Sequence, residues 1–175
     1  MSSILSKMFV AHQLDLLHLS IINLLDMIKD GEIDLVLEQN KKTAVQKSLF
    51  IQKIIESLDS PELRDALQAE LDAKNIDFFL EKHLRDILVA LQKEAERIIP
   101  VHLTVAVEFK MRDLQDMVSL LSKSLGHQTV LDVHVDRSLI GGTVIQFGNY
   151  ISDYSIKSRL EQFRSRWEEA VVEKA

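Results

Sequence analysis

The sequence predicts an α+β fold, in which an N-terminal α-helical bundle is followed by a small C-terminal α/β domain. Up to Pro100, apolar residues recur every three or four positions, which is the spacing of helices with one buried face. Directly after Pro100 they alternate with polar residues, which is the spacing of a strand. Four of the five glycines follow residue 125, so turns are concentrated in the second part. We therefore expect two domains, residues 1–100 and 101–175.

The first expected helix covers residues 4–29 and ends at Gly31, because glycine readily adopts the left-handed conformation that closes a helix. Its apolar stripe, at alternating steps of three and four residues, consists of Leu14, Leu17, Ile21, Leu24 and Ile28. Further apolar side chains outside this stripe are Ile4, Leu5, Met8, Leu16, Leu19, Ile22 and Leu25. A helix that is apolar over most of its surface is either surrounded by other helices or offers a groove to a partner helix. The stripe residues are therefore candidates for partner docking.

The other helices of the bundle are expected over residues 42–58, 61–74 and 77–98. In the first of these, the apolar side chains expected to point inward are Val45, Leu49, Ile51, Ile54, Ile55 and Leu58. Ser60 is a favourable N-cap, and Pro61 suits the first helical position, where its missing N–H breaks no hydrogen bond. Pro100 ends the last helix because a proline disfavours helical geometry in the residue before it.

The second domain is expected to have the order strand, helix, strand, strand, helix. The expected ranges are 101–109, 111–125, 130–135, 143–147 and 155–170. The last helix has an apolar stripe of Ile156, Leu160, Phe163 and Trp167, of which the last three are candidates for partner docking. Its basic residues, expected opposite this stripe as a solvated face balanced by glutamates, are Lys157, Arg159, Arg164 and Arg166.

Two motifs allow both a functional and a structural interpretation. Gly141-Gly142 could belong to a phosphate-binding loop, but it lacks the G-x-x-x-x-G-K-[ST] spacing and leads into a strand. We expect a turn that needs positive φ or a close backbone approach. Asp153 and Ser155 could form a catalytic pair or cap the last helix. Because no histidine lies nearby in sequence to act as a base, we expect caps.

The composition disfavours several classes of function. The net charge is -6, and residues 1–100 carry 12 basic and 17 acidic side chains, so we expect neither nucleic acid nor anionic membranes as partners. The absence of cysteine excludes disulfides, thiolate zinc sites and cysteine nucleophiles. The six histidines form no pair at helical ligand spacing, so no metal or other cofactor is expected. Without an apolar run of membrane-spanning length or a secretory signal, we expect a soluble intracellular protein.

A set of residues at characteristic spacing runs through the second domain. It consists of Val135-Asp136, Ser138-Leu139-Ile140-Gly141-Gly142, Gly148, Asp153-x-Ser155 and Leu160. This set resembles the C-terminal signature of the delta subunit family of F-type ATP synthases, called OSCP in mitochondria. Residues 60–91 are similar to the closing helices of that family's N-terminal bundle. The sequence departs from the family pattern at Arg137, where proline is usual, and in residues 1–30, where the usual tyrosine-alanine opening is not recognisable.

The resemblance implies a non-catalytic peripheral-stalk subunit, or stator, that couples rotor torque to ATP synthesis and proton transport. The implied partners in this hetero-oligomer are the N-termini of the alpha subunits, held by the bundle, and the C-terminal helix of the b subunit, held by the second domain. The implied place is the cytoplasmic face of an energy-transducing membrane, with a bacterial inner membrane as the expected host. The residues given a structural role in turns and caps are Asp136, Ser138, Gly141, Gly142, Gly148, Asp153 and Ser155.

Two other functions stay open. A helical adaptor could use the same fold in another assembly, which the unrecognised N-terminal opening favours. A small nucleotide-using enzyme could be built around Gly141-Gly142.

Overall fold

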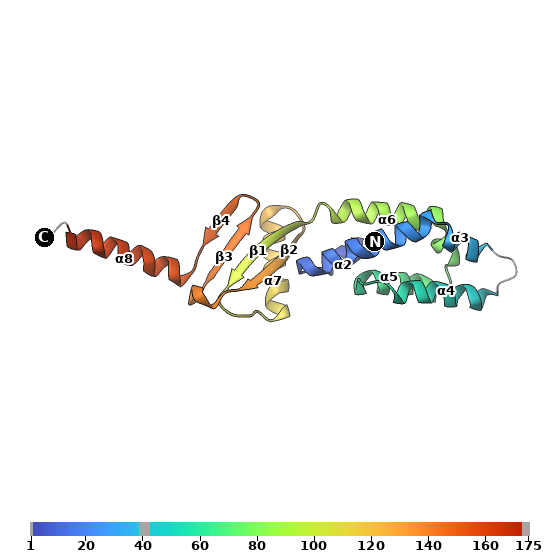
Figure 1. Cartoon of the computed structure of the whole chain (residues 1–175), viewed down its shortest axis with the longest axis horizontal. Coiled ribbons are helices and arrows are strands. Elements are labelled where there is room, and N and C mark those ends of the chain that lie inside the picture. The colour runs from blue at the N-terminus through green and yellow to red at the C-terminus, as the bar shows by residue number, and fades with distance from the viewer. Residues whose placement is uncertain (1, 39–42, 173–175) are drawn as a thin grey trace. The chain divides into compact units, whose positions relative to one another are not determined.

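A computed structural model describes residues 2–38 and 43–172 and divides the chain into two compact units, Met1–Ile98 and Ile99–Ala175. Helices build the first unit, and a mixed four-stranded sheet with helices α7 and α8 builds the second (Figure 1). The α+β fold class expected from the sequence is confirmed.

The helices of the first unit enclose one apolar core. They are α1 (Ser2–Leu5), α2 (Ala11–Lys29), α3 (Glu32–Leu37), α4 (Ala44–Glu56), α5 (Pro61–Asp72), a short 3-10 helix η1 (Ile76–Phe79) and α6 (Glu81–Ala95). Helix α2 contacts α3, α5 and α6, and α4 contacts α5. Leu17, Ile21 and Leu88 are completely buried between them. Each such side chain stabilises the fold by about 1.5–3 kcal/mol relative to an exposed one, so packing of these faces holds the bundle together.

Polar contacts at Ser60 fix the junction between α4 and α5. The Ser60 hydroxyl accepts a hydrogen bond from the Leu63 N–H, and Pro61 occupies the first helical position, as the sequence predicts. The buried hydroxyl of Ser20 in α2 accepts hydrogen bonds from the backbone N–H groups of Asp59 and Ser60. This pair of contacts ties α2 to the loop that precedes α5.

The second unit is a sheet with strand order β2-β1-β3-β4. Its elements are β1 (Ile99–Val105), α7 (Met111–Leu125), β2 (Thr129–Val135), a 3-10 helix η2 (Arg137–Leu139), β3 (Thr143–Phe147), β4 (Tyr150–Asp153) and α8 (Ile156–Val172). Strand β1 pairs in parallel with β2, with Val101 opposite Leu131, and antiparallel with β3, with Leu103 opposite Ile145. Helix α7 is the crossover that the parallel pair requires, and it packs on the sheet.

The helix predicted over residues 4–29 is interrupted at residues 6–10, so the long helix α2 is shorter than predicted. The side-chain oxygen of Gln13 accepts hydrogen bonds from the N–H groups of Phe9 and Val10. These contacts satisfy backbone groups at the start of α2, so a new helix begins there. Helix α3 was not expected, because six residues carry too little periodicity to recognise, and the helix expected over residues 77–98 is divided into the 3-10 helix η1 and helix α6.

The strands also differ from the prediction. Strand β1 ends at Val105 and not at residue 109, because β2 ends at Val135 and offers no partner beyond it. Strand β4 was not predicted, yet Phe147 pairs with Tyr150 across the two-residue turn Gly148-Asn149. A glycine-asparagine pair between two strand-like runs is a hairpin signal, so this strand could have been predicted.

Candidate docking surfaces

The Gly141-Gly142 turn packs against the start of α8. Gly142 has φ +81°, and a Cβ atom at this position would overlap the backbone carbonyl oxygen of Tyr154. The carbonyl of Gly141 accepts a hydrogen bond from the Ile156 N–H at 2.9 Å. Because the Tyr154 backbone lies against Gly142 and the Ile156 side chain lies against Gly141, this turn leaves no cradle for a phosphate and instead positions the first turn of α8.

Asp153 and Ser155 cap α8. The Asp153 carboxylate accepts a hydrogen bond from the Ser155 N–H at 2.8 Å, and the Ser155 hydroxyl accepts one from the Ser158 N–H at 3.1 Å. Hydrogen bonds from the Ser155 side chain and backbone lower the pKa of Asp153. These contacts satisfy N–H groups that the helix itself cannot pair, so the two side chains have a structural role at the base of α8.

A second acidic turn precedes β3. The carboxylate of Asp136 accepts a hydrogen bond from the Ser138 N–H at 2.8 Å, and hydrogen bonds from Ser138 lower the pKa of Asp136. The 3-10 helix η2 that begins here contacts α8. Gly148 lies apart, in the β3–β4 hairpin, where φ is +54°. The seven turn and cap residues named from the sequence thus lie around the base of α8 or in the adjoining hairpin.

Beyond this base, helix α8 presents an apolar stripe to solvent. It extends away from the sheet in Figure 1, and Leu160, Phe163 and Trp167 have exposed fractions of 53%, 64% and 65%. The rings of Phe163 and Trp167 stack at a centroid distance of 6.4 Å. An ordered row of large apolar side chains in water is typical of a protein–protein docking surface. This stripe is the first candidate surface.

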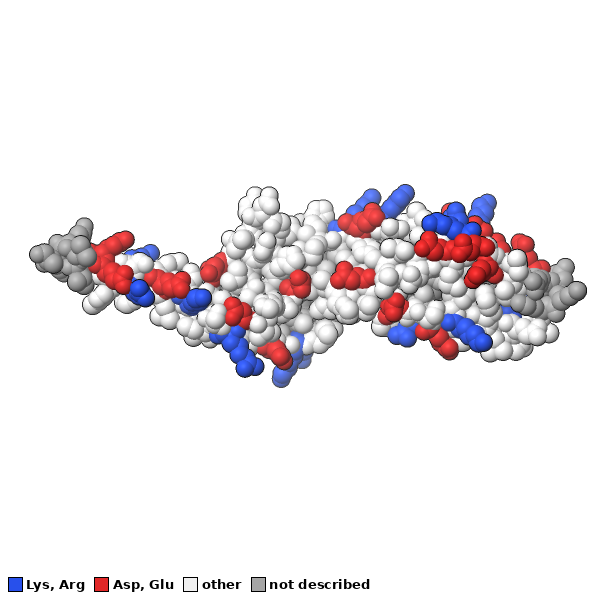
Figure 2. Space-filling model, viewed as in Figure 1, with Lys and Arg blue, Asp and Glu red and all other residues white. Residues whose placement is uncertain are grey.

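The basic residues of α8 flank the apolar stripe and do not lie opposite it, which corrects the expectation from the sequence. A helix turns by about 100° per residue. Lys157 and Arg164 therefore lie about 70–90° to one side of the stripe, and Arg159 and Arg166 lie as far to the other side. Glutamates such as Glu161 occupy the back of the helix, and Figure 2 shows acidic and basic side chains interspersed along it.

The docking role predicted for the main stripe of α2 has to be corrected. All five stripe residues are buried in the bundle core, namely Leu14, Leu17, Ile21, Leu24 and Ile28. Ile4, Leu5 and Met8 are buried as well, so this N-terminal segment is surrounded by its own bundle. Of the apolar residues outside the stripe, Leu19 and Ile22 are about half exposed. Burial by neighbouring helices, which periodicity cannot distinguish from burial by a partner, decides this outcome.

A groove between α4 and the end of α5 is the second candidate surface, and it was not predicted from the sequence. It has a volume of about 690 Å³ and is lined by Ala44, Val45, Ser48, Leu49, Gln52, Gln68, Leu71, Asp72, Lys74 and Ile76. Val45 and Leu49 were expected to point inward but are 68% and 58% exposed. On a helical wheel both lie about 120° or more from Ile51 and Ile54, which are buried. This angular gap was the sequence signal that Val45 and Leu49 do not face the core.

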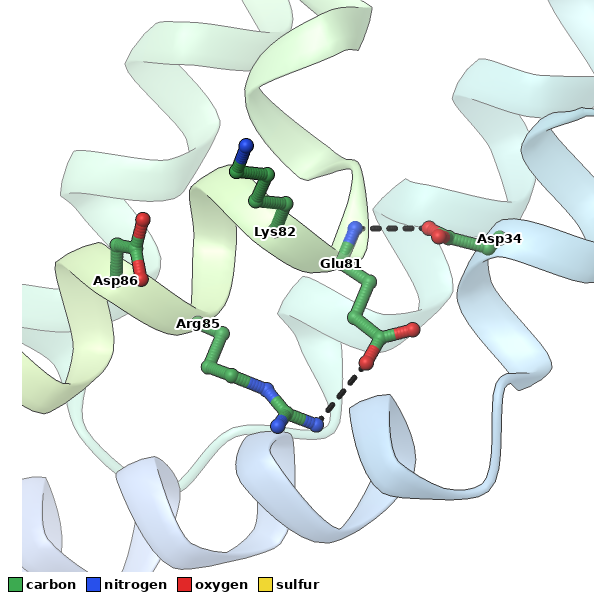
Figure 3. A pocket seen from close by; sticks show the side chains of 5 residues that line it. All are labelled: Asp34, Glu81, Lys82, Arg85 and Asp86. Atoms are coloured by element: carbon green, nitrogen blue, oxygen red, sulfur yellow. Dashed lines mark hydrogen bonds and ion pairs between the residues drawn. The ribbon is translucent and has the colours of Figure 1, made fainter.

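A charged hollow of about 300 Å³ lies at the start of α6 (Figure 3). The Asp34 carboxylate accepts a hydrogen bond from the Glu81 N–H at 2.8 Å and so caps α6 from another helix. Arg85 pairs with Glu81 at 3.0 Å, and Lys82 and Asp86 complete the lining. In Figure 3 the contact between Asp34 and Glu81 joins α3 to α6, whereas Glu81 and Arg85 pair within α6, so these contacts have a structural role.

Neither a membrane span nor a metal site was found in the described part of the chain. Across residues 2–38 and 43–172, no helix combines the length and the apolar character needed to cross a bilayer. The same residues contain no group of three or more histidine, aspartate or glutamate side chains arranged to hold a metal ion.

Comparison with known proteins gives a consistent family. The model of the family described as ATP synthase delta (OSCP) subunit matches residues 11–166. The ATP synthase subunit delta of Xylella fastidiosa (strain M12) is 34% identical over 97 residues, which cover 51% of this chain and 55% of that protein. The corresponding protein of Desulforudis audaxviator (strain MP104C) is 27% identical over 138 residues, covering 73% of this chain and 76% of that protein. The match to the Xylella relative thus spans just over half of that relative's length.

Among solved structures, a chain of the Toxoplasma gondii mitochondrial ATP synthase hexamer is 14% identical, with a TM-score of 0.37. The alignment covers 87% of this chain and 86% of that chain. Family membership rests on the sequence match, which includes the α8 base with its turn and caps and most of the helical bundle. The resemblance seen in the sequence is confirmed: the chain belongs to the ATP synthase delta (OSCP) subunit family.

Proposed function

We propose that this protein is a non-catalytic peripheral-stalk subunit of an F-type ATP synthase, which joins the catalytic head to the membrane-anchored stalk. Family membership over residues 11–166 is the observation that carries this proposal. A link of this kind prevents the head from turning with the rotor, so that torque is used for ATP synthesis or proton transport. The role requires binding surfaces and stiffness, and no group that makes or breaks a bond.

The two candidate surfaces suit two different partners. We propose that the groove lined by Val45 and Leu49 binds the N-terminal segments of the alpha subunits, and that the α8 stripe binds the C-terminal helix of the b subunit. Both surfaces expose apolar side chains of helices, which suits amphipathic helical segments as partners. Supporting this assignment, the caps and the glycine turn hold the base of α8 in place, so a force on its stripe is passed to the sheet.

A pull-down with the full chain tests both contacts separately. Immobilised protein is offered two kinds of peptide from the same ATP synthase, the N-terminal segment of an alpha subunit and the C-terminal helix of the b subunit. The variant V45D/L49D is expected to lose at least tenfold in affinity for the alpha peptide and to keep the b helix, because an aspartate in an apolar contact is costly to desolvate. The variant L160D/F163D is expected to show the opposite pattern.

Each variant serves as the control for the other, since all four side chains are exposed and the fold should tolerate the changes. If the unmodified chain binds neither partner, the proposal is overturned and an adaptor in another assembly is favoured. Loss of both partners in both variants would point to unfolding, which circular dichroism of each variant detects.

We further propose that the complex containing this chain lies at the cytoplasmic face of a bacterial inner membrane. A peripheral component of such a complex needs no membrane span of its own. The expected outcome of cell fractionation is that the chain sediments with the membranes and is released when the catalytic head is stripped off. Retention on stripped membranes that also lack the b subunit would contradict this.

A further inference from the structure

The exposed stripe of α8 has the spacing of a coiled-coil seam. Ile156, Leu160, Phe163 and Trp167 follow one another at steps of four, three and four residues, which is the a/d pattern of the heptad repeat. With Leu160 and Trp167 at a, the d positions are Ile156 and Phe163. All four side chains are exposed to solvent, so a second helix has access to the whole seam.

All four flanking positions of this seam are basic. Lys157 and Arg164 occupy e, and Arg159 and Arg166 occupy g, whereas the acidic residues Glu161, Glu168 and Glu169 occupy b and c. In a coiled coil, the e and g side chains of one helix face those of the partner helix and set the choice of partner. The charge of α8 is therefore sorted, with basic side chains beside the seam and acidic side chains away from it.

Among the described residues, the acidic groups that interact with these four side chains are exposed or half-buried. Arg164 pairs with Glu168 at 2.9 Å, and the charge of Lys157 contributes to the lowered pKa values of Asp136 and Asp153. Exposed pairs of this kind contribute little to stability and rearrange readily when a partner arrives. Arg159 and Arg166, on the g side, are exposed as well.

We infer that α8 is one half of a coiled coil whose other half is a helix with an apolar heptad seam flanked by acidic residues. The inference names the chemistry of the partner at the surface where the proposed function places the stalk helix, and in that sense rests on it. The same four basic residues disfavour pairing of α8 with a second copy of itself, because like charges would face each other at every flanking position.

Trp167 allows a direct test, because it is the one tryptophan of the chain and lies in the seam. Two synthetic three-heptad helices without tryptophan are used, identical except for glutamate or lysine at every e and g position. Binding to the full chain is followed by the blue shift of Trp167 fluorescence. The acidic peptide is expected to bind at least tenfold more tightly at low salt, and the ratio is expected to fall towards one at about 1 M salt, where charges are screened within about 3 Å.

Matched variants separate charge position from total charge. R159Q/R166Q and Q162E/S165E each lower the net charge by two, the first beside the seam and the second on the back of the helix. Only the first is expected to weaken binding of the acidic peptide. The complete exchange K157E/R159E/R164E/R166E is expected to reverse the preference towards the basic peptide.

The inference would be overturned if the chain bound the two peptides with equal affinity or bound neither of them. It would also be overturned if sedimentation showed that the unmodified chain forms dimers and that these dimers are lost when Phe163 is replaced. Its failure is distinguishable from failure of the proposed function. If the helix of the b subunit binds while the two peptides bind equally well, the proposed function stands and the inference fails. If the peptides are discriminated while neither stalk partner binds, the inference stands and the proposed function fails.

Discussion

At Gly142, a single missing side chain lets two backbone segments lie together. Its φ of +81° and its contact with the Tyr154 carbonyl both exclude a Cβ atom, whereas Gly148 has a positive φ but open space around it. A comparison of the two positions therefore separates the energetic cost of a left-handed backbone conformation from that of a steric clash.

Replacement of Gly142 by alanine is expected to lower the free energy of unfolding by about 2–4 kcal/mol, since conformational strain and overlap with a backbone oxygen act together. Gly148→Ala, the matched control, is expected to cost only about 1–2 kcal/mol, from the left-handed conformation alone. Urea denaturation followed by circular dichroism measures both. Equal losses for the two variants would show that the close approach at Gly142 has no energetic weight.

The two turn carboxylates predict a dependence of stability on pH. Hydrogen bonds from Ser155 and Ser138 lower the pKa values of Asp153 and Asp136 in the folded state. The unfolded chain therefore binds protons more readily, so the stabilisation is present above the ordinary carboxyl pKa and is lost as pH falls through the lowered one. Asp153→Asn keeps an acceptor for the Ser155 N–H but cannot titrate. We expect a flatter decline in stability below about pH 4 for this variant, measured by urea unfolding at several pH values.

At the scale of an element, α8 and β1 show two different uses of the same residue type. Leu103 in β1 is buried at 1% exposure, whereas Leu160 in α8 is 53% exposed. One leucine contributes to folding of the second unit, and the other is available for association.

Leu103→Ala is expected to lower the free energy of unfolding by about 2–5 kcal/mol, because it leaves a cavity between the sheet and its helix. Leu160→Ala, in the same unit, is expected to stay within about 0.5 kcal/mol of the unmodified chain. Chemical denaturation of the two variants provides the comparison. A large loss for Leu160→Ala would mean that the α8 stripe is packed against its own chain.

At the scale of the whole molecule, each unit has an apolar core of its own. Leu17 and Leu88 belong to the first, and Val101 and Leu131 belong to the second. Along the sequence, the first unit ends at Ile98 and the second begins at Ile99.

Separate expression of residues 1–98 and 99–175 is therefore expected to give two fragments that each unfold cooperatively, because an independent core is the main requirement for independent folding. The measurement is thermal unfolding by circular dichroism, with the full chain for comparison. A fragment that shows no cooperative transition would mean that its core is completed by residues beyond the cut.

The type and order of most elements can be predicted from the sequence alone, since helix and strand depend on local spacing and local caps. In caps such as Ser60-Pro61, Asp153 and Ser155, the capping hydrogen bonds join residues that are close in sequence, so these caps can be recognised without knowledge of the fold. The exceptions are short elements such as α3, where six residues carry too little periodicity.

Which apolar stripe is core and which is free depends on how the elements pack in three dimensions. The stripes of α2 and α8 have the same helical spacing, yet Leu17 is completely buried and Phe163 is 64% exposed. Likewise Val45 and Leu49 line an open groove, although the apolar spacing of their helix predicts that they point inward. Periodicity shows that a face is apolar, whereas burial depends on whether another element of the chain covers that face. That difference determines which apolar faces remain available for a partner.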